Sequence, residues 1–493
     1  MLGLRPFAVS VLLIIGLHAA VTGQQRAGFG GEIEAGSVLS STSATPFWLR
    51  TNQFGIIPTQ APAGLLQAAV WKTYRAPDSI HSRKFDWGFK LNPVVTYERT
   101  SKATVLLPEA YVSVKFKTLE FYAGRRRQVT GLGDTVLSSG FYAESGNALP
   151  IPKIQIGTIG YAPLHFTKDF VAINAAFAHG WFNVPYIQDV RLHQKHLYIR
   201  LGKPASWLRG YAGINHQVQW AGHADYLKQR PDVGDGSGYL ASDWSFYKYV
   251  VFSYTPKEWA DVPGYTPFDS YRVGNSVGSI DFGLEFTTKA GSLLAYYQHA
   301  YEDVSGVVFL NMPDGLWGLS YTPASNNPAA FRVTRLTLEF LTTKYQSGTS
   351  FYIPGSTYQG VDNYYNHSQY IEGWSYFDRT IGTPFITPGQ DIDPSYNLPT
   401  VQYFSNNRVK MWYVGLQATY RKALFTLRVS QSQNFGTYNQ PFSPDVGQFS
   451  SLLSAHLPLF QWKNTFVLAK AAVDNGGLYT KATGYYIGLK KSW

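Results

Sequence analysis

The alternation of apolar and polar residues is the feature that most constrains how this chain can fold. Between Trp412 and Tyr420, large apolar residues occupy every second position, and smaller or more polar residues lie between them. Successive side chains of an extended strand point to opposite faces, so this segment has one apolar face and one wet face. Other segments repeat the pattern, among them 196–201, 280–286 and 335–340. The pattern predicts β-strands along most of the chain.

The charged residues of these segments fall on one face only. Asp281 and Glu285 lie opposite Phe282 and Leu284, for example. An ion in hydrocarbon costs several kcal/mol, so the charged face must look into water while the apolar face looks into lipid or a core. Mean hydropathy is −0.16, and no segment after the N-terminal region offers the long apolar run of a membrane helix. We therefore predict an all-β fold, a transmembrane antiparallel β-barrel.

Chain length and connections set the size of this barrel. About 470 mature residues, at roughly 25 per strand and connection, give about 18 strands. The short turn Arg421–Ala423 and the longer polar segment Asn434–Gly447 follow each other, as turns and loops do in such barrels. The last strand alternates and ends on Trp493, which resembles the closing strand of outer-membrane barrels. A soluble β-sandwich or propeller fits less well, because sandwiches seldom far exceed 250 residues and no blade repeat is visible.

Residues 1–23 have the pattern of a secretory signal peptide, with Arg5, an apolar run from Phe7 to Leu17, and small residues up to Gly23. The alternative, a membrane anchor, needs a longer apolar run. The chain has no cysteine, which excludes lipid anchoring at a lipoprotein signal, disulfides and thiolate metal sites. We assign 24–86 to a plug and first-strand region and 87–493 to the barrel.

A short helical plug is predicted near the N-terminus of the mature chain. Thr45 can cap a helix that has Pro46 at its first position, Phe47 to Leu49 inside it, and Gly55 beyond its end. The segment from Leu65 to Tyr74 satisfies both the helical and the strand period, so its structure stays open.

Two long connections are unusually rich in aromatic and amide or charged residues, namely Tyr345–Phe404 and Asp243–Tyr271. Aromatic faces stack on the C–H faces of sugar rings, while amides, carboxylates and guanidinium groups hydrogen-bond sugar hydroxyls. The alternative is an aromatic loop that only packs over the barrel mouth. The composition predicts a polysaccharide-binding site made by Trp244, Tyr247, Asn363, Tyr364, Tyr365, Trp374, Tyr376, Asp378 and Arg379.

Other motifs carry less weight. Gly274–Gly278 fits the G-x-S-x-G pattern of serine hydrolases, but it leads into a strand instead of the required strand-turn-helix elbow. Asp232–Gly238 lacks the later glutamate of a calcium loop and is predicted to be an exterior loop. The histidines form no metal-ligand pattern; His216 lies in an apolar strand register. No catalytic residue, metal or cofactor is expected.

The net charge of +11 comes from scattered residues, with Arg125–Arg127 the densest cluster. That run is too short for a nucleic-acid track. Lipid phosphates or an acidic polysaccharide would suit the excess charge equally well.

Several stretches together resemble the capsule-assembly Wzi proteins of Gram-negative bacteria, in the form found in Bacteroidetes. They span nearly the whole mature chain and keep their order. They are 46–52 (PFWLRTN), 124–131, 145–152 (SGNALPIP), 193–195 (HQK), 216–220 (HQVQW), 364–367 (YYNH), 381–384 (IGTP) and 406–409 (NNRV).

The resemblance implies an 18-stranded outer-membrane barrel with an N-terminal helical plug, acting as a lectin that holds exported capsular polysaccharide or exopolysaccharide at the cell surface. It implies neither catalysis nor a diffusion pore. The expected partners are that polysaccharide, outer-membrane lipid and the barrel-assembly machinery, with no nucleic acid, and the protein is expected to be a monomer. Two alternatives stay open: a substrate-specific porin for oligosaccharides, and an outer-membrane hydrolase.

Overall fold

The computed structural model describes residues 28–75, 84–98, 103–254, 273–324, 330–351, 353, 358–396 and 402–493. The predicted signal peptide, 1–23, lies outside these residues, as do Trp259 and Tyr265 of the second aromatic connection. None of the described helices is long and apolar enough to cross a membrane.

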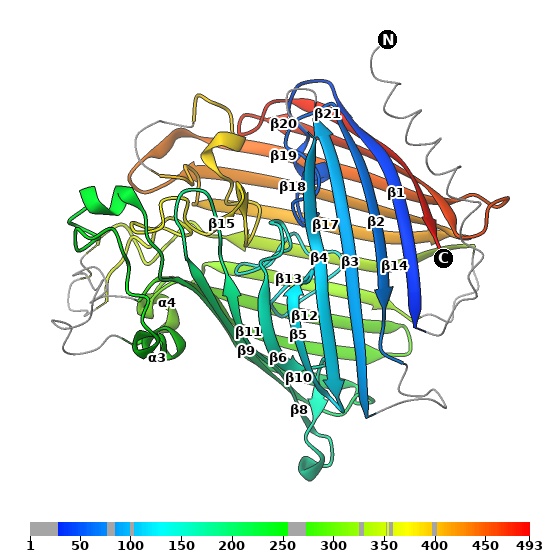
Figure 1. Cartoon of the computed structure of the whole chain (residues 1–493). Coiled ribbons are helices and arrows are strands. Elements are labelled where there is room, and N and C mark those ends of the chain that lie inside the picture. The colour runs from blue at the N-terminus through cyan, green and yellow to red at the C-terminus, as the bar shows by residue number, and fades with distance from the viewer. Residues whose placement is uncertain are drawn as a thin grey trace.

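Strands make up most of the described chain (Figure 1). They are β1 (Phe29–Ser40), β2 (Ala63–Lys72), β3 (Phe85–Glu98), β4 (Thr104–Phe116), β5 (Leu119–Arg125), β6 (Lys153–Thr158), β7 (Ala162–Pro163), β8 (Val171–Trp181), β9 (Arg191–Leu201), β10 (Leu208–Trp220), β11 (Asn275–Thr288), β12 (Gly291–Tyr301), β13 (Gly315–Pro323), β14 (Phe331–Thr342), β15 (Ser375–Tyr376), β16 (Arg379–Thr380), β17 (Val409–Tyr420), β18 (Ala423–Gly436), β19 (Pro441–Pro458), β20 (Thr465–Gly476) and β21 (Ala482–Ser492).

The described helices are few and short. They are α2 (Phe47–Arg50), α3 (Trp244–Phe252), α4 (Val304–Val307) and the 3₁₀ turns η2 (His165–Thr167), η3 (Asp225–Gln229) and η5 (Gly389–Asp391).

The strands form one closed antiparallel cylinder. Each strand pairs with its neighbour along the chain, and β1 pairs with β21 over Glu32–Ser40, which closes the sheet. The described sheet contains 19 segments, but β6 and β7 both pair with β8 and share one place, so the barrel has 18 strand positions. This confirms the predicted barrel and its strand number. β15 and β16 form a separate small hairpin.

The two ends of the barrel differ in their connections. One end, here called the turn end, has tight connections such as Lys117–Thr118, Lys289–Ala290 and Arg421–Lys422. The other, the loop end, has the connections 41–62, 126–152, 221–274 and 343–408. Short turns and long loops alternate as the sequence predicts.

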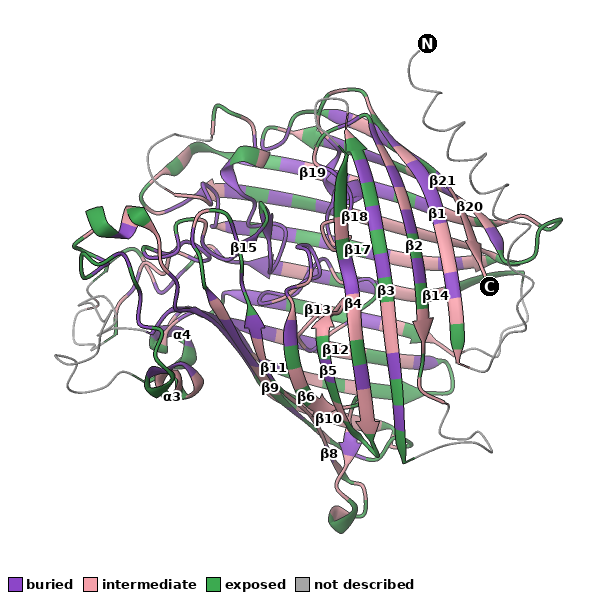
Figure 2. Cartoon of the chain, viewed as in Figure 1, coloured by how far each residue is buried: buried purple, intermediate pink, exposed green. Residues whose placement is uncertain are grey.

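The wall has an apolar outer face and a polar inner face. On β11, Phe282 is 45% exposed and Leu284 points the same way, whereas Asp281 is fully buried in the lumen. Figure 2 shows this alternation as bands along the strands. The outward-facing side chains of the described strands are mainly apolar and are therefore suited to contact hydrocarbon, as the period-two pattern predicts.

The N-terminal region differs in detail from its predicted form. The barrel begins at Phe29, not at Trp87, because β1 and β2 are full members of the wall, and the ambiguous segment Leu65–Tyr74 lies mainly in β2. The helix α2 is only four residues long, and Thr45 does not cap it: the N-cap is Pro46, which makes no side-chain hydrogen bond to the helix.

The α2 segment nevertheless lies inside the barrel as a plug. Phe47, Trp48 and Leu49 are almost fully buried. The backbone N–H of Phe47 donates to Asp474 of β20, and Trp48 Nε1 donates to Ser430 of β18, at 2.8 and 2.9 Å. Arg50 forms a buried ion pair with Asp391, at 2.7 Å, which links this plug to the connection 343–408.

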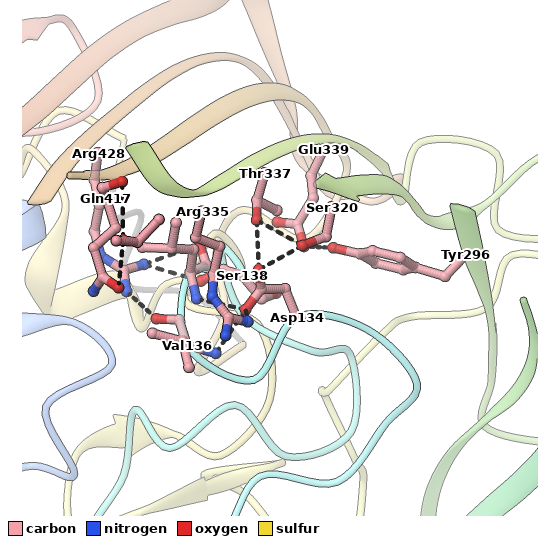
Figure 3. A network of polar contacts seen from close by, with 12 residues as sticks. Asp134, Val136, Ser138, Tyr296, Ser320, Arg335, Thr337, Glu339, Gln417 and Arg428 are labelled. Carbon is pink, nitrogen blue, oxygen red and sulfur yellow. Dashed lines mark hydrogen bonds and ion pairs between the residues drawn. The ribbon is translucent and has the colours of Figure 1, made fainter. Parts of the chain in front are cut away.

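A second inserted segment, 126–152, crosses the lumen from β5 and β6 to the opposite wall, a position that its sequence does not predict. The buried carboxylate of Asp134 accepts hydrogen bonds from Ser320 and Thr337, both at 2.7 Å, and pairs with Arg335 at 2.9 Å. Arg428 donates to the backbone oxygen of Val136. Figure 3 shows this network, which fastens 126–152 to β13, β14 and β18.

Candidate functional site

Four of the aromatic residues expected to stack on sugar are fully buried instead. Tyr364, Tyr365, Trp374 and Tyr376 have exposed fractions of 0 to 1%. Trp374 Nε1 donates to the backbone oxygen of Ala143 at 2.9 Å, so the ring holds the connection 343–408 onto the segment 126–152. For these four rings, the interpretation as packing over the barrel mouth fits the structure. A buried ring presents no face to a ligand.

Their partners explain this burial. Tyr365 donates its hydroxyl to the backbone oxygen of Tyr142, and the Tyr364 hydroxyl donates to Asp314 at 3.2 Å. Asn363, which is half-buried, accepts hydrogen bonds from Asn366 and Asn407 within the same connection. These residues form part of the buried interior of the connection 343–408.

Trp244 and Tyr247 lie elsewhere, on α3, which packs on the outward faces of β8 to β10 beside the barrel (Figure 1). Trp244 is 61% exposed, and Tyr247 packs against Trp220 and His193. The same helix covers His216, whose Nε2 lies 2.6 Å from Ser253 Oγ. The structure does not bring this pair together with Asp378 and Arg379.

Asp378 and Arg379 lie at a cavity of about 860 Å³ at the loop end, here called the mouth cavity. Its volume is within the range of ligand pockets, about 300 to 1,000 Å³. Both polar and apolar groups line the mouth cavity, and a sugar needs both, because it has apolar C–H faces and polar hydroxyl groups. The lining comprises Arg125 at the end of β5, the hairpin residues Phe377, Asp378 and Arg379, Gln390 and Asp391, residues of the plug segment 55–60, Leu149, and the loop-end parts of β3 and β4.

The hairpin β15–β16 places a strained tip at this cavity. Phe377 and Asp378, the two residues of its turn, both have positive φ, 46° and 60°. Such turns favour Asn-Gly, because a side chain is disfavoured in the left-handed region. Strain of this kind, of order 1 kcal/mol or more per residue, persists where surrounding contacts hold it and is concentrated at functional sites. The tip leaves the Phe377 ring 46% exposed beside the Asp378 carboxylate.

Arg379 follows the tip and is only 8% exposed. Its Nη2 donates to the backbone oxygen of Ile57 at 2.8 Å, which fixes the hairpin to the plug segment. Its Nη1 is buried and has no hydrogen-bond partner in the protein. Burial, and then the repulsion of Arg50, lower the pKa of Arg379 to about 10, so the group stays cationic at neutral pH. A buried cationic donor without a partner is a strong attraction for a ligand oxygen.

A second guanidinium, that of Arg125, also lines the mouth cavity, and Glu372 interacts electrostatically with Asp378. Arg125 donates to the hydroxyl of Tyr376 at 3.3 Å, and Asp378 accepts from Tyr403 at 3.2 Å. Burial, and then repulsion by Asp378, raise the pKa of nearby Glu372 to about 7. The site therefore offers donors and acceptors of both signs around one exposed ring.

Several lining groups were not among the predicted contacts. Arg125 belongs to the densest basic cluster of the sequence, so that cluster was the available signal. In the sequence, nothing distinguishes Phe377 from the many other aromatic residues of the same connection. The contribution of the plug segment 55–60 had no sequence signal, because it depends on how the plug meets the hairpin.

The remaining motifs take structural roles. Ser276 lies within β11 and is buried, without the strand-turn-helix elbow of a hydrolase. Asp232 pairs with Arg230, and Asp235 accepts from Ser237. Among the described residues, no group of three His, Asp or Glu side chains could hold a metal ion.

A larger hollow, of about 1,220 Å³, lies on the outer wall between β9 and β18. It is lined mainly by outward-facing apolar residues such as Leu284, Trp317 and Leu338, so it suits hydrocarbon and not a glycan.

Comparison with known proteins identifies the fold. No protein-family model and no curated protein matches the chain. Among solved structures, the chain is similar to Wzi of Escherichia coli, an outer-membrane protein involved in group 1 capsule assembly and a carbohydrate-binding β-barrel. The TM-score is 0.58 at 15% identity, over 98% of this chain and 87% of Wzi.

Two Pseudomonas aeruginosa proteins, OccK5 (OpdH) and OpdQ, align with TM-scores of 0.46 at 9% and 6% identity. Each alignment covers 94% of this chain, with 97% of OccK5 and 98% of OpdQ. The likeness to Wzi shows that the two chains share a β-barrel fold, which in this chain is a closed antiparallel cylinder of 18 strands.

Proposed function

We propose that this protein is an outer-membrane barrel that binds exported polysaccharide, capsular or related, at its loop end and attaches it to the cell surface. The observation that carries the proposal is the mouth cavity, whose lining includes the exposed Phe377 ring, the Asp378 carboxylate and the guanidinium groups of Arg125 and Arg379. An exposed ring face together with charged donors and acceptors matches the C–H face and the oxygens of a sugar.

The likeness to Wzi also supports polysaccharide binding, since that barrel is described as carbohydrate-binding. Long loops of outer-membrane barrels face the exterior, which puts the mouth cavity on the outer surface. The contact set keeps Asp378 and Arg379 from the one that composition suggested, and Phe377, Arg125 and Gln390 take the place of the buried aromatic rings. One site of this size holds only a few sugar units, so retention of a long polymer would come from many barrels binding one chain.

We favour this role over a substrate-specific porin because three segments, 41–62, 126–152 and 343–408, fold inward or across the mouth and bond to the wall or to each other. We also propose no catalytic role, because the hydrolase-like motif Gly274–Gly278 runs into the strand β11 and lacks the strand-turn-helix elbow. Single-channel conductance of the purified protein distinguishes this role from that of a porin, because a porin has an open lumen that conducts ions and a closed barrel does not.

The decisive experiment compares cell-attached with released polysaccharide in a deletion strain complemented with variants. Phe377→Ala combined with Arg379→Gln should shift polysaccharide to the medium. Tyr239→Ala should not, because Tyr239 is an exposed ring (55%, against 46% for Phe377) in the connection 221–274, outside the mouth cavity. If the deletion strain, with normal secretion, retains as much polysaccharide as the parent, the proposal is wrong.

A further inference from the structure

The turn end of the barrel carries a ring of lysine side chains. Six different turns each present one exposed lysine: Lys117, Lys168, Lys203, Lys289, Lys422 and Lys463, here called the basic ring. Among the described residues, none of these amines lies within ion-pair distance of a carboxylate. The carboxylate found in the described parts of the same turns is Asp169, which contacts His165 at 2.8 Å. The ring is therefore cationic around most of the rim.

Exposed aromatic rings accompany these lysines. Phe116 precedes Lys117, Phe166 and Phe460 lie two or three residues before Lys168 and Lys463, and Trp207 lies in the turn of Lys203. All four rings are more than half exposed. Aromatic side chains concentrate where hydrocarbon meets headgroups, so they place the basic ring at the headgroup level of the leaflet on the turn side.

The loop end carries exposed charges of both signs. Its exposed carboxylates include Asp189, Asp235, Asp378 and Asp445, and its exposed lysines include Lys248, Lys410 and Lys481. In the basic ring, by contrast, Asp169 is the carboxylate found in the described parts of the turns. The basic ring therefore calls for an anionic partner that surrounds the barrel, because its lysines follow the circumference and do not gather on one patch.

We propose that the basic ring binds the phosphate headgroups of anionic phospholipids in the leaflet at the turn end, the inner leaflet of the membrane. Each lysine can extend its alkyl chain along the apolar wall and hold its amine among the phosphates. One lysine near an anionic surface strengthens association by about fivefold at low salt. The inference does not rest on polysaccharide binding.

The test measures lipid selectivity of the full-length barrel in vesicles. Brominated phosphatidylglycerol or phosphatidylcholine quenches tryptophan fluorescence when it contacts the wall, which gives the relative association of the two lipids. The wild-type protein should prefer phosphatidylglycerol by about fivefold at low ionic strength, and salt at about 1 M should abolish most of that preference. A variant with Lys203, Lys289, Lys422 and Lys463 all changed to Gln should lose most of it.

A matched variant removes the same charge from the loop end, with Lys228, Lys248, Lys410 and Lys481 changed to Gln. All four are exposed, and this variant should keep most of the wild-type selectivity. Heat-dependent migration in gels confirms that both variants are folded. An equal loss in the two variants, or no lipid selectivity in the wild type, overturns the proposal. So does binding of a soluble acidic polysaccharide to the same four lysines without lipid selectivity.

Discussion

Replacing Asp134 by alanine tests whether the segment 126–152 keeps the lumen closed. The Asp134 carboxylate is fully buried. Its Oδ2 accepts hydrogen bonds from Ser320 and Thr337, and its Oδ1 forms an ion pair with Arg335. The same oxygen also accepts the backbone N–H groups of Val136 and Leu137, at 2.9 and 3.0 Å. One side chain therefore organises the turn at 134–137 and fastens it to the wall.

Removing one partner of a buried ion pair costs about 3–5 kcal/mol, because the other charge loses its compensation. The Arg335 side chain keeps 29% exposure and can recover part of its hydration, so we expect the lower end, about 3 kcal/mol. That loss falls on the attachment of 126–152 more than on the strands. We expect the segment to leave the wall for part of the time while the cylinder stays folded.

Planar-bilayer conductance measures the opening, and urea unfolding followed by tryptophan fluorescence measures the loss of stability. Asp134→Ala should show channel events that the wild-type protein lacks. Asp235→Ala, in the exposed connection 221–274, is the control and should behave as wild type. If Asp134→Ala stays silent and unfolds at the same urea concentration as wild type, the segment does not depend on this carboxylate and the reasoning fails.

Three further predictions concern the plug and the mouth cavity. Trp48→Ala should lower the free energy of unfolding by about 3–5 kcal/mol, since it removes a buried ring and its bond to Ser430; urea titration checks this. Arg379→Gln should weaken polysaccharide binding by about tenfold or more, the value of a charged hydrogen bond, as isothermal titration calorimetry would show; unchanged affinity would exclude the unpartnered Nη1 as a contact. The raised pKa of Glu372, about 7 against 4.5 unfolded, means that its protonated form fits the fold. Stability of the connection 343–408 should be full below about pH 4.5 and fall as pH rises through 7, and Glu372→Gln should remove this dependence in hydrogen exchange.

The wall of the barrel was predictable because one rule governs each strand. Hydrocarbon on one side and water on the other impose a period of two, and residues such as Phe282 and Asp281 follow it whatever their partners are. Strand number followed from chain length alone. The predicted start of the barrel, at residue 87, was wrong because β2 has apolar residues at adjacent positions, such as Leu65 and Leu66. Such a segment fits both the helical and the strand period.

The mouth was predictable only in part. Composition singled out the connection Tyr345–Phe404, and it pointed to Asp378 and Arg379, which line the mouth cavity. It could not separate Trp374, which is buried, from Phe377, which is exposed, because both lie in a segment without a repeating period. The burial of Trp374 depends on contacts with 126–152, more than 200 residues earlier in the chain, such as its bond to Ala143.

The attachment of 126–152 also imposes an order on assembly. Its partners come later in the chain: Asp281 lies 149 residues after Leu132, and Arg428 lies 292 residues after Val136. Until β11 to β18 are in place, this stretch lacks its bonds to the opposite wall, and bringing such distant residues together carries a large loss of chain entropy. A growing cylinder therefore gains the attachments of this interior segment late, strand by strand.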